Sequence, residues 1–172
     1  FNQPWTIEEI EIGDPVKDEV KIQMEASGMC HSDHHLVTGD IPMAGFPVLG
    51  GHEGAGIVTE VGPGVENVKP GDHVVLSWNP HCGHCFYCDR DLPILCENYL
   101  GEGPKARAFD GESRARLDDG RELQQLMFLG SFGEYCIVAD QQAVVVPQDM
   151  PFDRACLIGC GVMTGVGAGL NL

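Results

Sequence analysis

Short segments in which apolar and polar residues alternate dominate the chain up to about position 150. Such alternation, or a short run of branched apolar residues, is typical of β-strands with a buried face. Gly and Pro separate these segments, as at Gly13-Asp14-Pro15. Many short strands joined by turns predict an all-β barrel or sandwich core. The predicted strands are residues 6–12, 20–26, 54–61, 73–76, 135–139 and 143–146.

Two segments have the spacing of helices instead. Residues 32–37 form a short candidate helix that ends before Gly39, and glycine commonly follows the last helical turn. After Asp153, the sequence DRACLIGCGVM has apolar residues at helical intervals. The chain is therefore predicted to be mainly β with a few helices, an α+β protein.

The composition is that of a globular domain, with 43% apolar and 21% charged residues among 172. The net charge of -16 argues against a nucleic-acid partner, because binding to phosphate backbones relies on Lys and Arg. No apolar run approaches the ~20 residues that span a bilayer, so we expect no membrane partner. The sequence opens on Phe1 without Met or a signal-like segment, which indicates a trimmed N-terminus and a cytoplasmic protein.

Four of the eight cysteines lie in one segment, HCGHCFYCDRDLPILC. The spacing Cys82-x₂-Cys85-x₂-Cys88-x₇-Cys96 lets four thiolates converge and complete a tetrahedron around one Zn²⁺. No coordination position then remains for a substrate, so the predicted role of residues 81–96 is structural. An iron–sulfur cluster is the alternative, because three close cysteines and a distant one also suit such clusters. The two histidines of this segment are interpreted as exposed loop residues.

A second set of potential ligands is spread along the chain. Cys30 and His52 lie within residues 28–56, and Cys160 follows in the sequence LIGCGVMTG. Thiolate and imidazole form a ligand set that Zn²⁺ prefers, and three protein ligands leave a fourth position open, as in catalytic zinc sites. The alternative is that Cys30 and His52 are core residues, since free cysteine is often buried.

Three features coincide in this order: Cys30 with Gly51-His52-Glu53, the cysteine loop, and Gly159-Cys160-Gly161. As a set they resemble the zinc-dependent alcohol dehydrogenases of the medium-chain dehydrogenase/reductase family, over nearly the whole chain. The resemblance implies that residues 1–172 are the N-terminal, catalytic domain of such an enzyme, with a GroES-like β-barrel fold. It also implies two zinc ions per chain, a catalytic one on Cys30, His52 and Cys160 and a structural one on the cysteine loop.

The same resemblance implies roles for residues around the catalytic zinc. Ser32 matches the hydroxyl that hydrogen-bonds the alcohol, and His35 matches the end of the proton relay. Glu53 matches a carboxylate near the metal. Asp33 matches the carboxylate that orients the ligand histidine, which also follows from the need to fix an imidazole tautomer.

Other positions match residues that contact the cofactor or line the pocket. His31 occupies a position that often carries Arg against the cofactor pyrophosphate, and Thr164 one on the nicotinamide side. Trp78, Phe128 and Leu129 fall where apolar pocket residues occur, with core packing as the alternative for each.

The predicted function is the oxidation of a small-molecule alcohol to an aldehyde or ketone, with hydride transfer to NAD or NADP, by an intact enzyme that is a homo-oligomer. The chemistry agrees, because a divalent metal lowers the pKa of an alcohol and a histidine can receive its proton. A non-catalytic zinc-binding module on the same fold remains an alternative. A glutathione- or mycothiol-dependent formaldehyde dehydrogenase is another.

The segments between and after the motifs predict the domain organisation. No Gly-x-Gly-x-x-Gly comes after a strand, so no Rossmann domain is expected in this chain, and the fragment alone is expected to be inactive. Residues 153–172 are interpreted as the start of a helix towards an absent cofactor domain. Residues 97–130 are interpreted as a surface insertion, and Cys136 and Cys156 as small core residues.

Overall fold

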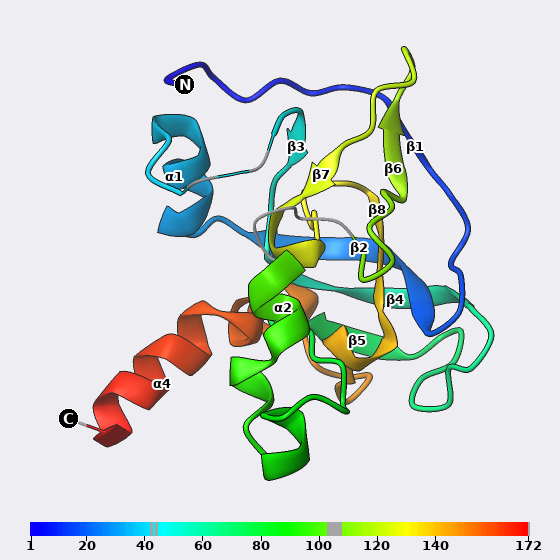
Figure 1. Cartoon of the computed structure of the whole chain (residues 1–172), viewed down its shortest axis with the longest axis vertical. Coiled ribbons are helices and arrows are strands. Elements are labelled where there is room, and N and C mark those ends of the chain that lie inside the picture. The colour runs from blue at the N-terminus through cyan, green and yellow to red at the C-terminus, as the bar shows by residue number, and fades with distance from the viewer. Residues whose placement is uncertain (42, 44, 103–107, 172) are drawn as a thin grey trace.

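The computed structural model describes residues 1–41, 43, 45–102 and 108–171, and these form a β-rich domain with short helices at its periphery (Figure 1). The strands are β1 (Ile10–Ile12), β2 (Glu19–Gly28), β3 (Val48–Leu49), β4 (Glu53–Val61), β5 (His73–Leu76), β6 (Ala115–Leu117), β7 (Gln124–Gln125), β8 (Tyr135–Ala139) and β9 (Ala143–Val145). The α-helices are α1 (His31–Thr38), α2 (Glu97–Glu102), α3 (Phe152–Ala155) and α4 (Gly161–Asn171). The 3₁₀ turns are η1 (Cys88–Arg90), η2 (Pro93–Leu95), η4 (Leu126–Phe128), η5 (Asp140–Gln142) and η6 (Cys156–Gly159).

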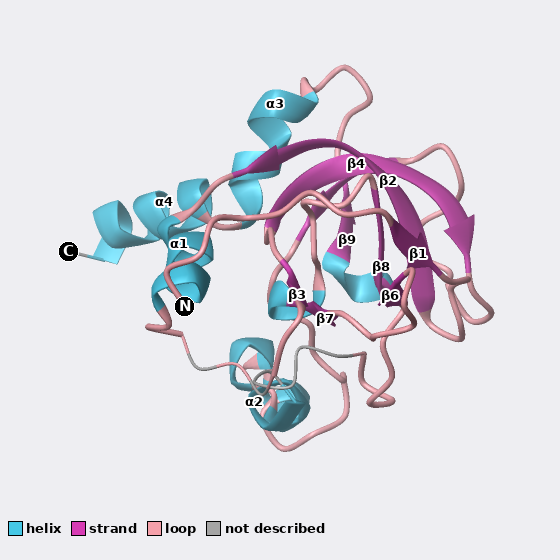
Figure 2. Cartoon of the chain, turned by 90° about the horizontal axis from the view of Figure 1, so that it is seen from above, coloured by secondary structure: helices cyan, strands magenta, loops and turns pink. Residues whose placement is uncertain are grey.

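The main sheet is antiparallel and five-stranded, in the order β8-β2-β4-β5-β9. Its long strands β2 and β4 curve over the shorter strands (Figure 2), and β2 is irregular at Lys21/Ile22 and Met24/Ala26. Two small sheets, β1-β6 and parallel β3-β7, lie beside it. The prediction of a mainly β fold with a few helices is confirmed. Within the described residues, hydrogen bonding gives three separate sheets rather than one closed ring of strands.

The packing of the core explains why the alternation of apolar and polar residues predicted the positions of the strands. Val20 and Ile22 of β2 are fully buried, whereas Gln23 is exposed. These two side chains pack with residues of β4, β5 and β8 in one apolar cluster, which also contains Leu129. Burying one such aliphatic side chain contributes roughly 1.5–3 kcal/mol. The predicted first strand, 6–12, forms regular pairing only at its end, as β1.

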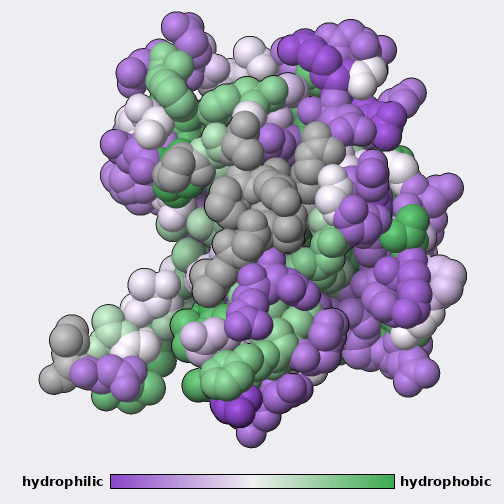
Figure 3. All heavy atoms as spheres, viewed as in Figure 1, coloured by the Kyte–Doolittle hydropathy of each residue, from purple (hydrophilic) through white to green (hydrophobic). Residues whose placement is uncertain are grey.

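The two helical predictions are also confirmed. The first candidate helix corresponds to α1, which ends where Gly39 adopts a left-handed conformation with φ 86°. The segment after Asp153 forms α3, η6 and α4 in succession. Helix α4 extends away from the sheet, and its visible atoms in Figure 3 are mostly white to green apart from one purple group. Its side chains are largely exposed, Leu170 at 80%.

Residues 103–107 lie outside the described residues, and the rest of the segment 97–130 is less of a surface insertion than its composition suggests. Ala115–Leu117 pairs with β1, and Gln124–Gln125 pairs with β3. Leu126, Phe128 and Leu129 are buried, so the second half of this segment contributes to the core. The physical reason is tertiary packing. The polar stretch between β6 and β7 folds back in a turn, and the apolar residues after β7 fill space under the main sheet.

Two further predictions concern single residues and the membrane. Cys136 and Cys156 are both buried, which confirms that they are small core residues, and burial raises the pKa of Cys136 to about 12. Among the described residues, none of the helices has both the length and the apolar character needed to cross a bilayer.

Candidate metal centres

Three potential ligands that are distant in sequence meet near the end of β2 and the beginning of β4, two neighbouring interior strands of the main sheet. Cys30 is the residue before α1, His52 directly precedes β4, and Cys160 lies between η6 and α4. Their ligand atoms all lie within 4.8 Å of one another. The structure thus brings together the three residues that were predicted to form the catalytic centre.

The donor set and its surroundings fit a metal ion. His52 is completely buried, and neither of its ring nitrogens has a hydrogen-bond partner in the described part of the chain. A buried imidazole without a partner costs free energy unless something else binds it. Two thiols beside that imidazole make a set that suits Zn²⁺.

Asp33 holds this arrangement in place from helix α1. Its Oδ2 lies 3.4 Å from His52 Nδ1 and accepts a hydrogen bond from the backbone N–H of Cys30 at 3.0 Å. Its Oδ1 accepts a second hydrogen bond, from Gly51 N–H at 2.9 Å. One buried carboxylate therefore anchors the backbone at Cys30 and at Gly51, and it faces Nδ1 of His52. Its role as the residue that orients a metal-bound His52 remains a prediction.

The electrostatics of the three side chains differ. Burial alone lowers the pKa of His52, but the carboxylate of Asp33 and the nearby Cys30 outweigh burial and raise it. Burial raises the pKa of Cys30, but hydrogen bonds with Ser32 and the proximity of His52 outweigh it, so the net pKa is lowered. The pKa of Cys160 is raised to about 11, by burial first and then by Cys30 and Glu53.

Glu53 is buried behind the centre and supports its third ligand. Its Oε1 accepts a hydrogen bond from the N–H of Gly161 at 2.7 Å, which fixes the loop that carries Cys160. Two glycines near this contact have no space for a side chain. A Cβ on Gly28 would lie 2.3 Å from Glu53 Oε2, and one on Gly159 would lie 2.2 Å from the carbonyl oxygen of Leu76.

The other predicted site residues lie around this centre at varying distances. Ser32 Oγ lies 3.8 Å from Cys30 Sγ. His35 is half-exposed on α1, and its Nδ1 lies 3.1 Å from Asp40 Oδ2. His31 is exposed beside it, with the two ring centres 4.6 Å apart. Their roles towards an alcohol or a cofactor remain predictions.

Thr164 and the candidate pocket residues vary in exposure. Thr164 is exposed on α4, and its N–H donates to the carbonyl oxygen of Cys160 at 2.8 Å. Trp78 is half-buried and its ring centre lies 6.1 Å from that of Tyr99. Phe128 and Leu129 are buried, and Leu129 belongs to the main core, so packing accounts for these two positions.

Sequence reasoning missed Asp40 as the partner of His35. The available signal was Gly39: its left-handed conformation turns the chain back, so that the next residue hydrogen-bonds both the backbone and the side chain of His35.

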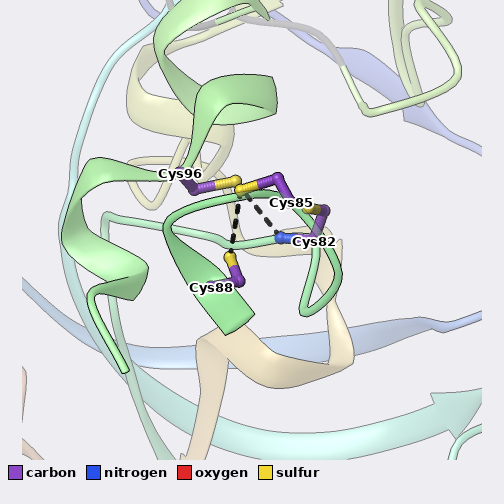
Figure 4. Close-up of side chains that lie close together, drawn as sticks. All are labelled: Cys82, Cys85, Cys88 and Cys96. Atoms are coloured by element: carbon purple, nitrogen blue, oxygen red, sulfur yellow. Dashed lines mark hydrogen bonds between the residues drawn. The ribbon is translucent and has the colours of Figure 1, made fainter. Parts of the chain in front are cut away.

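The cysteine loop forms a second, compact group. The four ligand atoms lie within 4.8 Å of one another, and the four side chains point towards one another (Figure 4). Cys85 Sγ lies 3.5 Å from Cys88 Sγ, and Cys96 Sγ accepts a hydrogen bond from Cys82 N–H at 3.3 Å. Four sulfurs around one tetrahedral zinc at 2.3 Å are about 3.8 Å apart, so the spacing fits a single ion.

The thiols of the loop are electrostatically unequal. Hydrogen bonds from backbone N–H groups, chiefly that of Cys88, lower the pKa of Cys85 to about 6. Burial, followed by the neighbouring thiol of Cys85, raises the pKa of Cys88 to about 11. Of the two loop histidines, His84 is exposed as expected and His81 is half-buried.

Comparison with known proteins agrees with this geometry. Residues 16–148 match the family described as "Alcohol dehydrogenase GroES-like domain". The chain is 58% identical to "Alcohol dehydrogenase B" of Mycobacterium tuberculosis, over 99% of this chain and 45% of that protein. It is 40% identical to the "S-(hydroxymethyl)glutathione dehydrogenase" of Candida maltosa, over 96% of this chain and 43% of that protein.

A solved structure has the same fold. The alcohol dehydrogenase zinc-binding domain protein of Burkholderia ambifaria superposes with a TM-score of 0.91 at 34% identity, over 98% of this chain and 45% of that one. The chain thus spans somewhat less than half the length of the relatives it matches. The family match, these relatives and the two cysteine-containing groups together show that the chain belongs to the alcohol dehydrogenase GroES-like domain family, as an N-terminal domain of the zinc-type medium-chain dehydrogenases.

Proposed function

We propose that this chain is the catalytic domain of a zinc-dependent alcohol dehydrogenase. Cys30, His52 and Cys160 hold one zinc ion, and the cysteine loop holds a second. The intact enzyme oxidises an alcohol to an aldehyde or ketone and transfers hydride to NAD or NADP. The observation that carries the proposal is His52, a buried imidazole without a hydrogen-bond partner among the described residues, flanked by two thiols from distant segments.

The residues around the first centre have separate tasks in this proposal. Zinc, when bound, supplies a positive charge that lowers the pKa of an alcohol. Ser32 hydrogen-bonds the alcohol hydroxyl, which is supported by the position of its Oγ beside Cys30 Sγ. His35 receives the proton at Nε2, because Asp40 engages Nδ1. Glu53 keeps the third ligand in place through Gly161.

The cofactor contacts belong to the same proposal. His31 faces the pyrophosphate of NAD or NADP in the intact enzyme, and Thr164 contacts the nicotinamide side. Both residues are exposed. His31 directly follows Cys30 in the sequence, and the backbone N–H of Thr164 donates a hydrogen bond to the carbonyl oxygen of Cys160, which is compatible with these roles.

Zinc is favoured over an iron–sulfur cluster at the cysteine loop. Each thiolate of a four-iron cluster binds a different iron, so its sulfurs lie farther apart than sulfurs around one ion. Ligand atoms within 4.8 Å of one another support a single tetrahedral ion. Its role is to order a loop in which only Cys96 among the four ligands is buried.

The comparisons favour an alcohol over a thiol adduct as substrate. Identity to a protein named alcohol dehydrogenase is 58%, against 40% to one named S-(hydroxymethyl)glutathione dehydrogenase. We therefore propose a small-molecule alcohol or aldehyde as the substrate. A cytoplasmic location and a homo-oligomeric state remain predictions from the sequence, to be checked by fractionation and by light scattering of the intact enzyme.

The first experiment measures metal content in the purified chain. We expect two zinc ions per chain, and one in Cys160→Ala. Cys156→Ala is the matched control, because Cys156 is a buried cysteine close by that is not part of either group. A single zinc per chain, held by the loop and unchanged in Cys160→Ala, would favour the non-catalytic module.

A second experiment asks whether the first centre has an open position. In the cobalt-substituted chain, adding an alcohol should shift the visible absorption bands of cobalt. The shift should disappear in Cys160→Ala, in which only the closed four-thiolate site remains. Bands that do not respond to alcohol at saturating concentrations would contradict a catalytic centre. In the intact enzyme, NAD(P)H absorbance should report turnover in wild type and its loss in Cys160→Ala.

A further inference from the structure

Helix α1 presents a group of imidazoles outside the two centres described above. His31 and His35 are four residues apart on this helix, so their side chains are neighbours on one face. Their ring centres lie 4.6 Å apart with the ring planes at 87°. His34 is the third imidazole, with its ring centre 5.3 Å from that of His31. Helix α1 lies at the periphery of the molecule (Figure 1).

The separation of the first two rings fits coordination of one ion. Two imidazoles bound to a metal at about 2.1 Å have ring centres roughly 4.5–5.5 Å apart, depending on the angle at the metal. Two histidines at positions i and i+4 of a helix are a recurrent arrangement for binding zinc. The exposure of His31 and the half-exposure of His35 leave the pair accessible to an ion from solvent.

Asp40 adds an independent feature of metal sites. Its Oδ2 lies 3.1 Å from His35 Nδ1 and accepts a hydrogen bond from the hydroxyl of Thr38. Carboxylate-bound imidazoles of this kind have a fixed tautomer and present Nε2 as the ligand atom. Asp40 itself is held by its N–H, which donates to the carbonyl oxygen of His35 at 3.0 Å.

The net charge of the chain also favours a cation. The chain carries a net charge of -16, and a strongly negative protein raises the local concentration of cations at its surface. Imidazole ligands select late divalent metals such as Ni²⁺, Cu²⁺ and Zn²⁺ over Mg²⁺ and Ca²⁺, which prefer oxygen.

We propose that His31 and His35 form a third, surface metal site that takes a late divalent transition-metal ion, with Asp40 as the positioning residue. Two protein ligands leave the remaining coordination positions to water. The regulatory consequence rests on the proposed function: an ion bound here occupies both the residue assigned to the cofactor pyrophosphate and the residue assigned to proton release. Such an ion therefore inhibits the intact enzyme.

The test uses the chain without a polyhistidine tag and with both cysteine-containing centres loaded with zinc. Equilibrium dialysis against Ni²⁺ should give one nickel per chain with the zinc content unchanged. His31→Ala and His35→Ala should each weaken nickel binding at least tenfold, and Asp40→Asn about tenfold. The matched control is His84→Ala, an exposed histidine outside both groups, which should bind nickel as wild type does.

The outcomes separate the site from the proposed enzymatic function. Failure to bind nickel, or binding that survives in both α1 histidine variants, overturns the site whether or not the intact enzyme is active. An equal loss in His84→Ala overturns it as well, because binding would then be unspecific. Inhibition is measured separately, as the loss of turnover of the intact enzyme on adding Ni²⁺. Nickel bound without any loss of turnover overturns the regulatory role alone.

Discussion

The two candidate metal centres are built in opposite ways. The four thiols of the cysteine loop come from one short segment, whose regular structure consists of two 3₁₀ turns and in which only Cys96 is buried among the ligands. The three ligands of the other centre lie close to the ends of β2, β4 and η6, and these three elements pack against one another. We therefore expect the loop to depend on a metal for its order, whereas the fold itself brings the other three ligands together.

This difference has a physical cause. Loop residues that bury little apolar surface cannot offset the entropy of ordering the chain, so the binding free energy of a metal has to do so. At the other centre, two buried carboxylates hold the backbone at the thiol ligands. Asp33 accepts a hydrogen bond from the N–H of Cys30, and Glu53 accepts one from the N–H of Gly161, next to Cys160. Removing metal should therefore disorder the loop and leave the geometry around His52 largely intact.

The largest effect is expected at the cysteine loop. Cys88→Ala removes one of four thiolates, and structural zinc sites contribute about 10–16 kcal/mol of apparent binding free energy in isolated domains. The loop zinc should be lost, and limited proteolysis should cut within residues 81–97 while the rest of the chain stays resistant. His84→Ala in the same loop should change neither readout. Resistance of the Cys88→Ala loop to protease would show that the fold, and not the metal, orders it.

The next largest effect tests whether the fold, rather than the metal, places the ligands of the centre formed by Cys30, His52 and Cys160. In Gly159→Ala the added Cβ would lie 2.2 Å from the carbonyl oxygen of Leu76, so the backbone around Cys160 has to move. We expect a loss of about 1–3 kcal/mol in unfolding free energy, typical of overpacking. One zinc should become removable by a chelator at concentrations that wild type tolerates, and the loop zinc should remain.

Gly165→Ala is the matched control for this change. A Cβ on Gly165 has nothing within 4 Å among the described residues, and alanine favours helix by about 1 kcal/mol over glycine. This variant should keep both zinc ions and the stability of wild type or slightly more. Equal zinc loss in the two glycine variants would contradict the idea that the backbone under Cys160 is what places this ligand.

The same contrast decides how much the sequence could predict. The cysteine loop is local, so its spacing alone predicted that its four cysteines lie together, as the structure shows. The alternation of apolar residues located β2 and β4, because one face of each contributes to the core. For Cys160, residue type suggested a place beside Cys30 and the resemblance supported it, and the structure brings the two residues together. The ion pair between Arg114 and Glu19 was out of reach, because 95 positions separate its partners and only the tertiary fold brings them together.

A smaller effect is expected from the residue behind His52. Asp33→Asn keeps the shape of the side chain but removes the charge that raises the pKa of His52. Changes in residues that orient metal ligands typically cost 10–100-fold in metal affinity, which is about 1.4–2.7 kcal/mol. Competition with a colour-forming chelator should show weaker binding at one centre only. Equal weakening at both centres would instead indicate a general loss of stability.

The smallest effect concerns the segment after the cysteine loop, which is tied to the sheet through charge. Arg114 donates to both carboxylate oxygens of Glu19 at 2.9 Å and also binds Asp110. Burial raises the pKa of Asp110, but Arg114 outweighs burial, so the net pKa is lowered below that of the unfolded chain. The carboxylate therefore stabilises the fold above the unfolded pKa of about 4, and this contribution disappears as the pH falls through the folded pKa.

Asp110→Asn should accordingly lower the unfolding free energy at pH 7 by less than about 1 kcal/mol, because the pair is partly exposed. The difference between variant and wild type should decrease as the pH falls below about 4, as followed by urea unfolding between pH 3 and 7. Because this anchor contains no metal ligand, its effect should be the same in zinc-loaded and chelator-treated protein, as expected for independent sites. An effect that disappears on chelation would mean that the loop metal also orders the contact between Asp110 and the sheet, and the two regions would then be coupled rather than independent.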